Sequence, residues 1–572
     1  PFIEKGLRLL SPGGRMAYIA PSLWVVNAYG RGLRGLIRER GQLDRWVDFK
    51  AHQIFDEAIT YTSLQFFTRA PNACVRMALA PAGETDTADI DWDDPALAVP
   101  YDRLSADAEW LIATGEERAL IDRLAETCLR LDNASLTDGI IVGVQATLNY
   151  VYHLERVNEG SYRCYPRDGN PRGGVPHSPA HVVEIEDGIM RPLISGDEAN
   201  RYENPETTTY LLFPYAPDEK GSMQPLSETT LRRQYPKAWN HLSKWRKNLN
   251  SGDETWWRYT YPKNLAAQQR PKLVVGQTVP FLRVSADTAG EYYLDNVRVN
   301  GILAADEQRL EYVMGALNSS VADFVFRRLG KPKQGGYFEA NKQFIAPLPI
   351  PDASPDDRAD VAARARDLQD RWTNRRDLDR AAQDRLGTLV RARHDARWLW
   401  PNELPPHADL VEQAPRALTA RGDRIAWAHQ RFEALEAIEI AKLQASLDGG
   451  SRLTAAFADG ELRLFAGGTA ILGRIYLDDG PGRMAEAYWR WLLLSQSWRD
   501  AKSFAGKLRQ PPTEADTPPA RQFVERVHAL AEETAAIETA EAEMNALLYR
   551  LYDLSEDERE LVENERRRRE GG

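Results

Sequence analysis

The chain has 572 residues, of which 43% are hydrophobic and 27% are charged, an ordinary composition for a globular protein. At roughly 100–200 residues per domain this length predicts about three or four domains, and no apolar run approaches the ~20 residues of a membrane span. The net charge of −11 argues against non-specific binding of nucleic acid over the whole surface, but it leaves room for a local basic groove.

The cysteines and histidines suggest neither a disulfide framework nor a metal centre. Cys74, Cys128 and Cys164 share no metal-ligand spacing, so we expect a cytoplasmic, reducing environment. The nine histidines are scattered, and His177 and His181, four residues apart, lie among prolines. Helical metal ligation is therefore not expected, and we assign no metal site.

Residues 1–80 alternate between helix and strand signals, which predicts an α/β domain. Leu7, Leu9 and Leu10 fit the buried side of a helix, and residues 11–14 (SPGG) form a turn signal. A helix that leads through a tight turn into a strand is half of an α/β unit, so we expect its partner elements upstream of this chain. The further elements predicted here are a buried strand at 16–20, a helix at 30–40, and strands at 46–49 and 61–68.

The character of the chain changes twice in its middle part. Residues 81–136 are predicted to be a linker as far as residue 100 and then a helical connector. From 137 to 351, glycine, proline, asparagine and tyrosine are frequent and the strand signals are short, which predicts an irregular, β-containing domain. Residues 307–329 are predicted to form one amphipathic helix, and prolines at 348–351 end the domain. Its candidate strands are 272–275, 292–294 and 297–299.

Residues 352–572 are predicted to be mainly helical, with one hairpin around Asp459-Gly460. The fold class expected for the whole chain is therefore multidomain, α/β followed by α+β and then helix. The helical segments are 355–395, 421–447, 484–510 and 520–568.

Several stretches, taken in this order, resemble one family: the adenine-specific DNA methyltransferases of restriction–modification systems. The likeness is greatest to the large single-chain type IIG enzymes, which carry a TaqI-like C-terminal specificity domain. The resemblance rests on the collinear order of the stretches. They are residues 4–21, 46–67, 138–150 with 193–202 and 211–215, 317–319 with 335–351, and 545–563.

The resemblance implies a Rossmann-like domain that binds S-adenosylmethionine and methylates the exocyclic amine of an adenine flipped out of duplex DNA. Residues 1–80 would be the C-terminal part of that domain, and residues 137–351 would be the target-recognition domain. The family's glycine-rich cofactor loop and its Asn-Pro-Pro-Tyr motif do not occur in this sequence. The nearest strings, at 170–172 and 204–206, lack the second proline and the tyrosine. We therefore assign no catalytic residue here and expect the chain alone to be inactive.

Phe55 is the candidate for stacking on the flipped base. By resemblance, an aromatic residue just before the late strand, here 61–67, fills this role. An aromatic face restores roughly 1–3 kcal/mol per unstacked base. The alternative is that Phe55 is a core residue, and Tyr61 and His52 are the neighbouring candidates. Residues 22–27 follow a strand whose carboxyl end can carry a ligand, or they form an ordinary loop.

Two basic clusters interleaved with aromatic residues are candidates for DNA contact, because lysine and arginine bind phosphates and arginine also reads guanine. The alternative for the first, at 232–247, is a solvated helix face whose buried stripe is Trp239 and Trp245. In the second, at 327–342, a glycine pair permits close approach of the backbone. Gln277, Thr278 and Phe281 are weaker candidates, and residues 256–259 are expected in the core. The predicted contacts are Lys244, Arg246, Lys247, Arg327, Arg328, Lys331, Lys333, Gln334, Gly335, Gly336 and Lys342.

Two alternative functions remain at this point. The chain is a non-catalytic specificity subunit that acts with a separate methyltransferase, or a helical structural protein with no role on nucleic acid. The methyltransferase hypothesis is preferred over both, because a stand-alone reader has no need of half a Rossmann-like sheet. The partners expected are double-stranded DNA and either a missing N-terminal catalytic part or a separate methyltransferase subunit, with no membrane.

Overall fold

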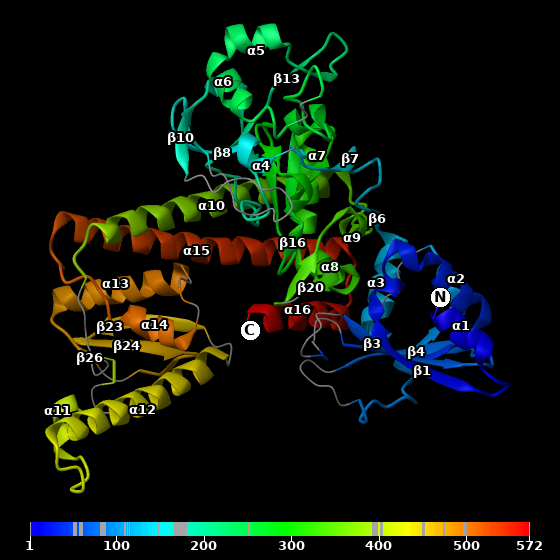
Figure 1. Ribbon diagram of the computed structural model, residues 1–572. Helices are drawn as coiled ribbons and strands as arrows, with labels where there is room; N and C mark the ends of the chain where they lie inside the picture. The colour runs from blue at the N-terminus through cyan, green and yellow to red at the C-terminus, as the bar shows by residue number, and fades with distance from the viewer. Residues whose placement is uncertain are drawn as a thin grey trace. The chain divides into compact units, whose positions relative to one another are not determined.

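The computed structural model forms two compact units (Figure 1). The first unit consists of residues 1–369 and 543–562, and the second of residues 370–542 and 563–572. The residues described are 2–49, 54–55, 61–80, 87–107, 110, 113, 115–146, 148–164, 180–249, 252–333, 335–391, 399–400, 404–448, 452–472, 475–495, 498 and 500–570.

A mixed sheet begins the first unit, with the strand order β1-β3-β2-β4-β5 among the described residues. β3 runs antiparallel to both β1 and β2, so β1 and β2 are parallel to each other. Pro21 at the end of β1 pairs with Thr62, and Asp48 at the end of β2 pairs with Ser63. The carboxyl ends of β1 and β2 therefore lie at the same edge as the start of β3. The strands are β1 (Arg15–Pro21), β2 (Leu43–Asp48), β3 (Thr62–Thr68), β4 (Cys74–Leu79) and β5 (Ala98–Pro100).

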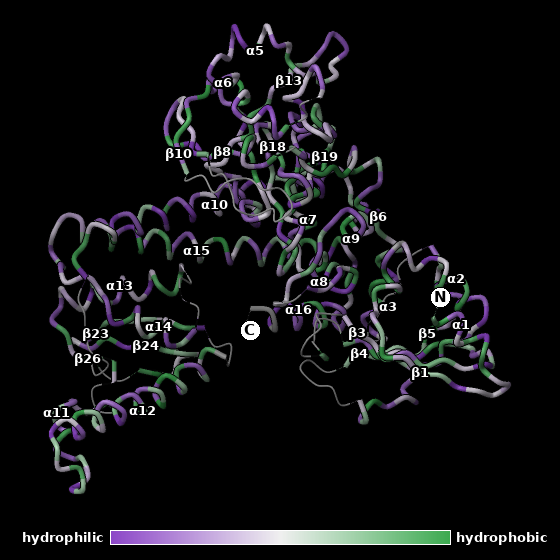
Figure 2. Tube along the Cα trace, viewed as in Figure 1, coloured by the Kyte–Doolittle hydropathy of each residue, from purple (hydrophilic) through white to green (hydrophobic). Residues whose placement is uncertain are grey.

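The core of this sheet is built on three tryptophans. Trp24 packs edge-on against Trp46 and Trp110, with ring centroids 5.4 and 5.5 Å apart. Leu7 and Ile37 bring the helices α1 (Phe2–Leu9) and α2 (Arg31–Arg40) onto the same cluster. Figure 2 shows hydrophobic residues along β4 and β5 and a largely hydrophilic α5 (Glu228–Gln234).

Three expectations for this region are corrected by the structure. Residues 98–100 are not linker, because Val99 is buried and β5 pairs with β4. β1 is not a buried strand: within the described part it pairs only with β3, and Ile19 is 49% exposed. Leu9 is exposed while Leu7 is buried, because a short helix turns only one stripe toward the sheet.

The middle of the first unit contains further sheets in its described part. One has the order β10-β9-β8-β12-β11-β18 and another the order β17-β15-β19-β7. Strand 272–275 is confirmed as β15, whereas residues 296–298 form a 3-10 turn and the strand predicted at 297–299 begins later. The bounds are β7 (Gly139–Val142), β8 (His153–Asn158), β9 (Ser161–Cys164), β10 (His181–Glu184), β11 (Met190–Ile194), β12 (Thr209–Leu212), β15 (Lys272–Gly276), β17 (Val284–Asp287), β18 (Tyr293–Leu294) and β19 (Val299–Leu303).

The aromatic run at 256–259 lies in the core, as expected. Trp256 and Trp257 are both buried and pack on Trp239, with centroids 5.4 and 5.5 Å away. The hydroxyl of Tyr259 donates to the carbonyl of Leu212 at 2.6 Å, which satisfies its buried oxygen. Trp239 belongs to α6 (Pro236–Lys244) and is buried as predicted for the first basic cluster, whereas Trp245, which follows the helix, is only half-buried.

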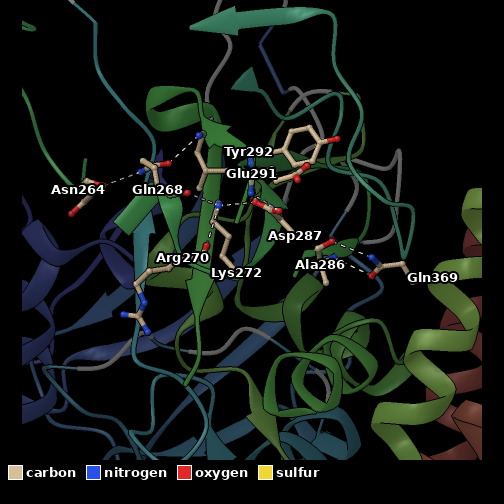
Figure 3. A network of polar contacts seen from close by, with 10 residues as sticks. Asn264, Gln268, Arg270, Lys272, Ala286, Asp287, Glu291, Tyr292 and Gln369 are labelled. Carbon is tan, nitrogen blue, oxygen red and sulfur yellow. Dashed lines mark hydrogen bonds and ion pairs between the residues drawn. The ribbon is translucent and has the colours of Figure 1, made fainter. Parts of the chain in front are cut away.

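A buried charge network joins β15 to β17 (Figure 3). The ammonium of Lys272 donates to Asp287 at 2.7 Å, to the carbonyl of Gln268 at 2.7 Å and to that of Arg270 at 3.2 Å. Burial lowers the pKa of Lys272, and the neighbouring Asp287 opposes that shift. All three ammonium donors have an acceptor, so the charge is accommodated without water.

The helix predicted at 307–329 is two helices, α7 (Glu307–Leu317) and α8 (Ser320–Leu329). The side chain of Asn318 accepts a hydrogen bond from the amide of Val284 and donates one to its carbonyl. The Ser319 hydroxyl then caps α8 by accepting from the amide of Ala322 at 3.1 Å. These local side-chain bonds compete with the helical pattern and break it.

Residues near the C-terminus complete the first unit. Asn545, on α15 (Pro518–Leu551), accepts a hydrogen bond at 3.0 Å from the amide of Ser320, the first residue of α8. The hydroxyl of Tyr552 donates to the carbonyl of Pro349 at 2.9 Å. Arg123, on α3 (Gly115–Thr127), makes two hydrogen bonds to Glu558 on α16 (Glu556–Glu570), at 2.9 and 2.6 Å.

The second unit is built from helices and one small sheet. The predicted hairpin is confirmed: Asp459 and Gly460 both have positive φ between β23 (Leu453–Ala458) and β24 (Glu461–Ala466). Buried aromatics of α13 (Asp479–Ser495), including Trp489, form the core against this sheet. None of the described helices is long and apolar enough to cross a membrane. The other helices are α10 (Pro355–Gly387), α11 (His407–Glu412), α12 (Arg421–Asp448) and α14 (Ala501–Leu508). Of these, α10 begins in the first unit, which extends to residue 369.

Candidate nucleic-acid interface

The second basic cluster, at 327–342, contains a β-hairpin. β20 (Lys331–Lys333) pairs with β21 (Tyr337–Glu339), which also pairs with β16 (Thr278–Val279). Gly335 and Gly336, with φ of 79° and 76°, make the turn in a region that glycine adopts without strain.

The pleat of this small sheet sorts its side chains onto two faces. Across the three strands Lys331, Glu339 and Thr278 are direct partners, and Lys333 is the partner of Tyr337. Because side chains alternate along a strand, these five share one face. The other face consists of Pro332, Phe338 and Val279, and it is directed toward the core, since Val279 is buried and Phe338 packs edge-on against Phe326.

The polar face of the hairpin lines a cavity of about 410 Å³. Its lining residues are Tyr61, Thr278, Lys331, Lys333 and Tyr337. Tyr61 immediately precedes β3, so it lies at the edge of the first sheet where β1 and β2 end. The cavity therefore brings the carboxyl edge of the α/β sheet together with the hairpin, and ligands of open α/β sheets bind at that edge.

Glu339 sets the electrostatics of the cavity. Its Oε2 lies 3.6 Å from the ammonium of Lys331 and 3.8 Å from that of Lys333. Its Oε1 accepts a hydrogen bond at 2.7 Å from Asn341. Lys333 also donates to the hydroxyl of Thr278 at 3.2 Å. Two cations and one carboxylate leave a net positive charge on this face.

The segment that follows β1 has a structural role in the same region. Both the amide and the hydroxyl of Ser22 donate to the carbonyl of Tyr61, at 2.8 and 3.3 Å. The buried guanidinium of Arg34 donates to the carbonyls of Trp24 and Asn27, each at 2.8 Å. These bonds favour the interpretation of residues 22–27 as a rigid support and not as a ligand-binding loop.

The helix α9 (Lys342–Ile345) ties the hairpin to this support. The side-chain amide of Gln343 donates to the carbonyl of Val26 at 2.7 Å. Asn341 caps the helix by accepting from the amide of Gln343 at 3.0 Å. Lys342 is exposed at the first position of the helix, where it is accessible to a ligand.

One predicted DNA contact is corrected by the structure. The guanidinium of Arg328 is paired with Glu117 and stacks on Phe324, 3.8 Å from the ring centroid. Both charged side chains are only 11% exposed. Arg328 therefore connects α8 to α3 and is not available to a phosphate. Arg327 also has an internal contact, because its guanidinium lies 5.2 Å from the ring of Phe338.

The remaining predicted residues have different surroundings. Lys244, Arg246 and Lys247 are exposed at and just beyond the end of α6, and the guanidinium of Arg246 lies 5.4 Å from the ring of Trp256. Phe55 is 40% exposed, in the connection between β2 and β3. Gln334 lies outside the described residues, as do residues 170–172.

The sequence predicted no role for Tyr337, which lines the cavity, or for Glu339, which lies beside its two lysines. A signal was present, because Lys-Pro-Lys and Tyr-Phe-Glu each alternate polar and apolar positions around a glycine turn. Within the described residues, no group of three or more histidine, cysteine, aspartate or glutamate side chains could hold a metal ion.

The comparisons with known proteins agree with the order of these parts along the chain. The Eco57I restriction-modification methylase family matches residues 1–55, and the TaqI-like C-terminal specificity domain matches residues 192–350. These matches confirm the resemblance found in the sequence: the chain is similar to type II restriction–modification methyltransferases that carry a TaqI-like specificity domain.

Particular relatives can be named. The chain is 23% identical over 383 residues to the type II restriction enzyme and methyltransferase RM.Eco57I of Escherichia coli, covering 62% of this chain and 36% of that protein. It is 23% identical over 364 residues to the type II methyltransferase M.PaeR7I of Pseudomonas aeruginosa, covering 61% of this chain and 58% of that protein. The chain thus spans less than two thirds of the length of either relative.

This chain is also similar to a solved structure, that of the type IIL restriction-modification enzyme MmeI in complex with DNA. The match covers 63% of this chain and 42% of the MmeI chain. The sequence identity is 11% and the TM-score is 0.38, a likeness too weak to support an argument about fold or function.

Proposed function

We propose that this chain supplies DNA target recognition to an adenine-specific type II methyltransferase of a restriction–modification system. The observation that carries the proposal is the collinear match of a methylase family and a TaqI-like specificity domain on one chain. A cavity lined by Lys331 and Lys333 lies at the carboxyl edge of the first sheet. This cavity supports the proposal that DNA binds between the methylase-like part and the specificity-like part of the chain. Residues 137–351 are assigned to target recognition.

We also propose that the first sheet is the late part of a Rossmann-like methyltransferase sheet. β1 and β2 are parallel and joined through α2, and β3 returns between them in the antiparallel sense. This arrangement supports the proposal, because a βαβ unit places ligands at the carboxyl ends of its strands.

The methyl donor of the proposed reaction is S-adenosylmethionine, which supplies the methyl group. No described residue set of this chain fits it: the polar groups that follow β1 are taken up by the bonds of Ser22 and Arg34. We therefore derive no step through the cofactor. What the chain contributes is DNA binding by the hairpin lysines and an aromatic face for the extruded base at Phe55.

The proposal is tested with duplex DNA and radiolabelled S-adenosylmethionine. The chain alone is expected to bind duplex DNA, with an affinity that falls as salt rises, and to transfer no methyl group. A preparation that also contains the Asn-Pro-Pro-Tyr catalytic part, on the same polypeptide or as a separate subunit, is expected to methylate adenine. Mass spectrometry of digested DNA identifies the modified base, and no DNA binding by the chain overturns the proposal.

Phe55→Ala tests the base-stacking role in that complete system. Loss of a stacking face worth roughly 1–3 kcal/mol is expected to slow methyl transfer roughly five- to hundredfold, with unchanged thermal unfolding. Phe55→Trp should retain most of the activity. The matched control is Phe2→Ala, which removes a phenylalanine that is 81% exposed on α1. Equal kinetics for Phe55→Ala and wild type would remove Phe55 from the site.

A further inference from the structure

We propose that the cavity of the hairpin binds one phosphate of the DNA backbone, and that Glu339 is a built-in competitor that holds Lys331 and Lys333 in position until the phosphate arrives. The inference rests on the proposed function and deepens it. It adds Glu339 and Tyr337 to the residues that act on DNA, and it gives a role to Thr278, which the sequence already suggested as a weaker candidate.

The two lysines keep donors available for such a ligand. The two ammonium nitrogens lie 3.6 and 3.8 Å from Oε2 of Glu339. These contacts are ion pairs, because the distances are too long for hydrogen bonds. An ammonium has three donors, and among the described contacts Lys333 uses one, on Thr278. The side chains of Lys331 and Lys333 are 24% and 36% exposed, so they are partly withdrawn from water yet accessible.

The position of Glu339 is fixed, so its carboxylate does not move when the lysines turn toward a ligand. Its backbone is paired on both sides, with Lys331 in β20 and Thr278 in β16, and its Oε1 is held by Asn341. The side chain of Glu339 is 17% exposed. A phosphate at the cavity mouth presents more anionic oxygens to the lysines than the single Oε2, so it displaces the ion pairs without moving the strand.

The walls of the cavity favour a nucleic-acid phosphate over a simple anion. Tyr61 and Tyr337 line the same cavity as the two lysines and add aromatic surface to it, and Tyr337 is 43% exposed. A nucleotide offers a sugar and a base next to its phosphate, and these stack on such rings. Thr278 adds a hydroxyl that can contact a phosphate oxygen.

The first experiment measures DNA affinity against salt by fluorescence anisotropy, with short duplexes of unrelated sequence. Lys331→Ala and Lys333→Ala are each expected to weaken binding by a similar factor on every sequence. The slope of log K against log salt should become shallower by about 0.9 for each phosphate that the variant no longer neutralises. The matched control is Lys220→Ala, an exposed lysine on the separate hairpin of β13 (Tyr215–Pro217) and β14 (Met223–Pro225), which should match wild type.

Glu339→Gln tests whether Glu339 competes with the phosphate for the two lysines or only stabilises the hairpin. The amide keeps an acceptor for Asn341 but removes the charge, so binding should become roughly two- to fivefold tighter, the size of a partly exposed ion pair. Tyr337→Ala should weaken binding and Tyr337→Phe should not. Weaker binding by Glu339→Gln, with thermal unfolding unchanged, contradicts the proposal.

The source of the phosphate is settled by competition. Inorganic phosphate at matched ionic strength should displace DNA no better than chloride does. Displacement specific to phosphate, and lost in Lys333→Ala, would assign the cavity to a free anion and overturn the inference. If wild type binds DNA but both lysine variants match it, this inference fails alone. If wild type binds no DNA, the proposed function fails with it.

Discussion

At the scale of single residues, the described first unit depends on charges that are removed from water and fully paired. Lys272 is completely buried, and Asp287, its cross-strand partner, is 2% exposed. The carboxylate also accepts the amides of Glu291 and Tyr292, each at 3.0 Å. A pair of this kind is costly to break, because the remaining charge has no solvent to stabilise it.

Lys272→Met is therefore expected to destabilise the first unit by about 3–5 kcal/mol. Lys272→Met combined with Asp287→Asn should recover part of that loss, because the amide is neutral and still accepts a backbone hydrogen bond. Hydrogen exchange of β15 and β17 measures both variants, and Lys263→Met, at an exposed lysine of the same unit, is the control. A double variant less stable than Lys272→Met would contradict this account.

Residue-level roles were the hardest part to predict from sequence. The basic cluster at 327–342 was identified by its composition, yet Arg328 turns inward to a glutamate 211 residues away in the chain. No local pattern marks such a partner. No role was predicted for Glu339, because the register that places it next to two lysines is set by strand pairing and not by a local pattern.

At the scale of elements, the junction of α7 and α8 is bonded to the backbone of β17 and of the residues just before it. Asn318 satisfies both backbone groups of Val284 on β17, and Asp323 of α8 accepts the amide of Leu282 at 2.7 Å. Buried backbone groups left without partners cost about 1–3 kcal/mol each. The break between the helices therefore couples them to the sheet that carries Lys272.

Asn318→Ala is expected to destabilise this junction by about 1–3 kcal/mol, with faster hydrogen exchange at Val284 and in β17. Asn318→Asp retains the acceptor but loses the donor, so its effect should be intermediate. Exchange in β23 and β24 of the second unit serves as the internal control. If β17 exchanges as in wild type, the helix break has another cause.

Element types were predicted more reliably than element boundaries. The helix at 31–40, the strand at 62–68 and the hairpin at 459–460 follow from local turn and periodicity signals. The helix break at Asn318 and the strand at 98–100 were missed. Both depend on partners outside the segment, namely the backbone of β17 and the edge of β4.

At the scale of the whole molecule, the first unit is discontinuous in sequence, since residues 543–562 return to it after the second unit. Helices were predicted in that stretch from local periodicity, but periodicity does not reveal the unit to which a helix belongs. Their assignment follows from polar bonds made by Asn545, Tyr552 and Glu558.

A chain ending at residue 542 is therefore expected to lose thermal stability in its first unit and to bind DNA more weakly. Asn545→Ala is the milder test, because it removes the side chain that accepts the amide of Ser320; a lost cap of this kind costs about 1 kcal/mol. Arg550→Ala is its control, an exposed residue on the same helix whose ion pair with Asp357 is long, at 3.4 Å. Unfolding of the shortened chain at the wild-type temperature would contradict this prediction.

The discontinuity also has a consequence for biosynthesis. A ribosome adds roughly 5–20 residues per second, so the stretch between residues 369 and 543 delays the closing segment by on the order of ten seconds or more. Until then the nascent first unit lacks the hydrogen bond from the amide of Ser320 to Asn545 and the pairing of Arg123 with Glu558. Translation that stops before residue 543 thus leaves the first unit without these contacts, so the stability of this unit depends on synthesis reaching the closing segment.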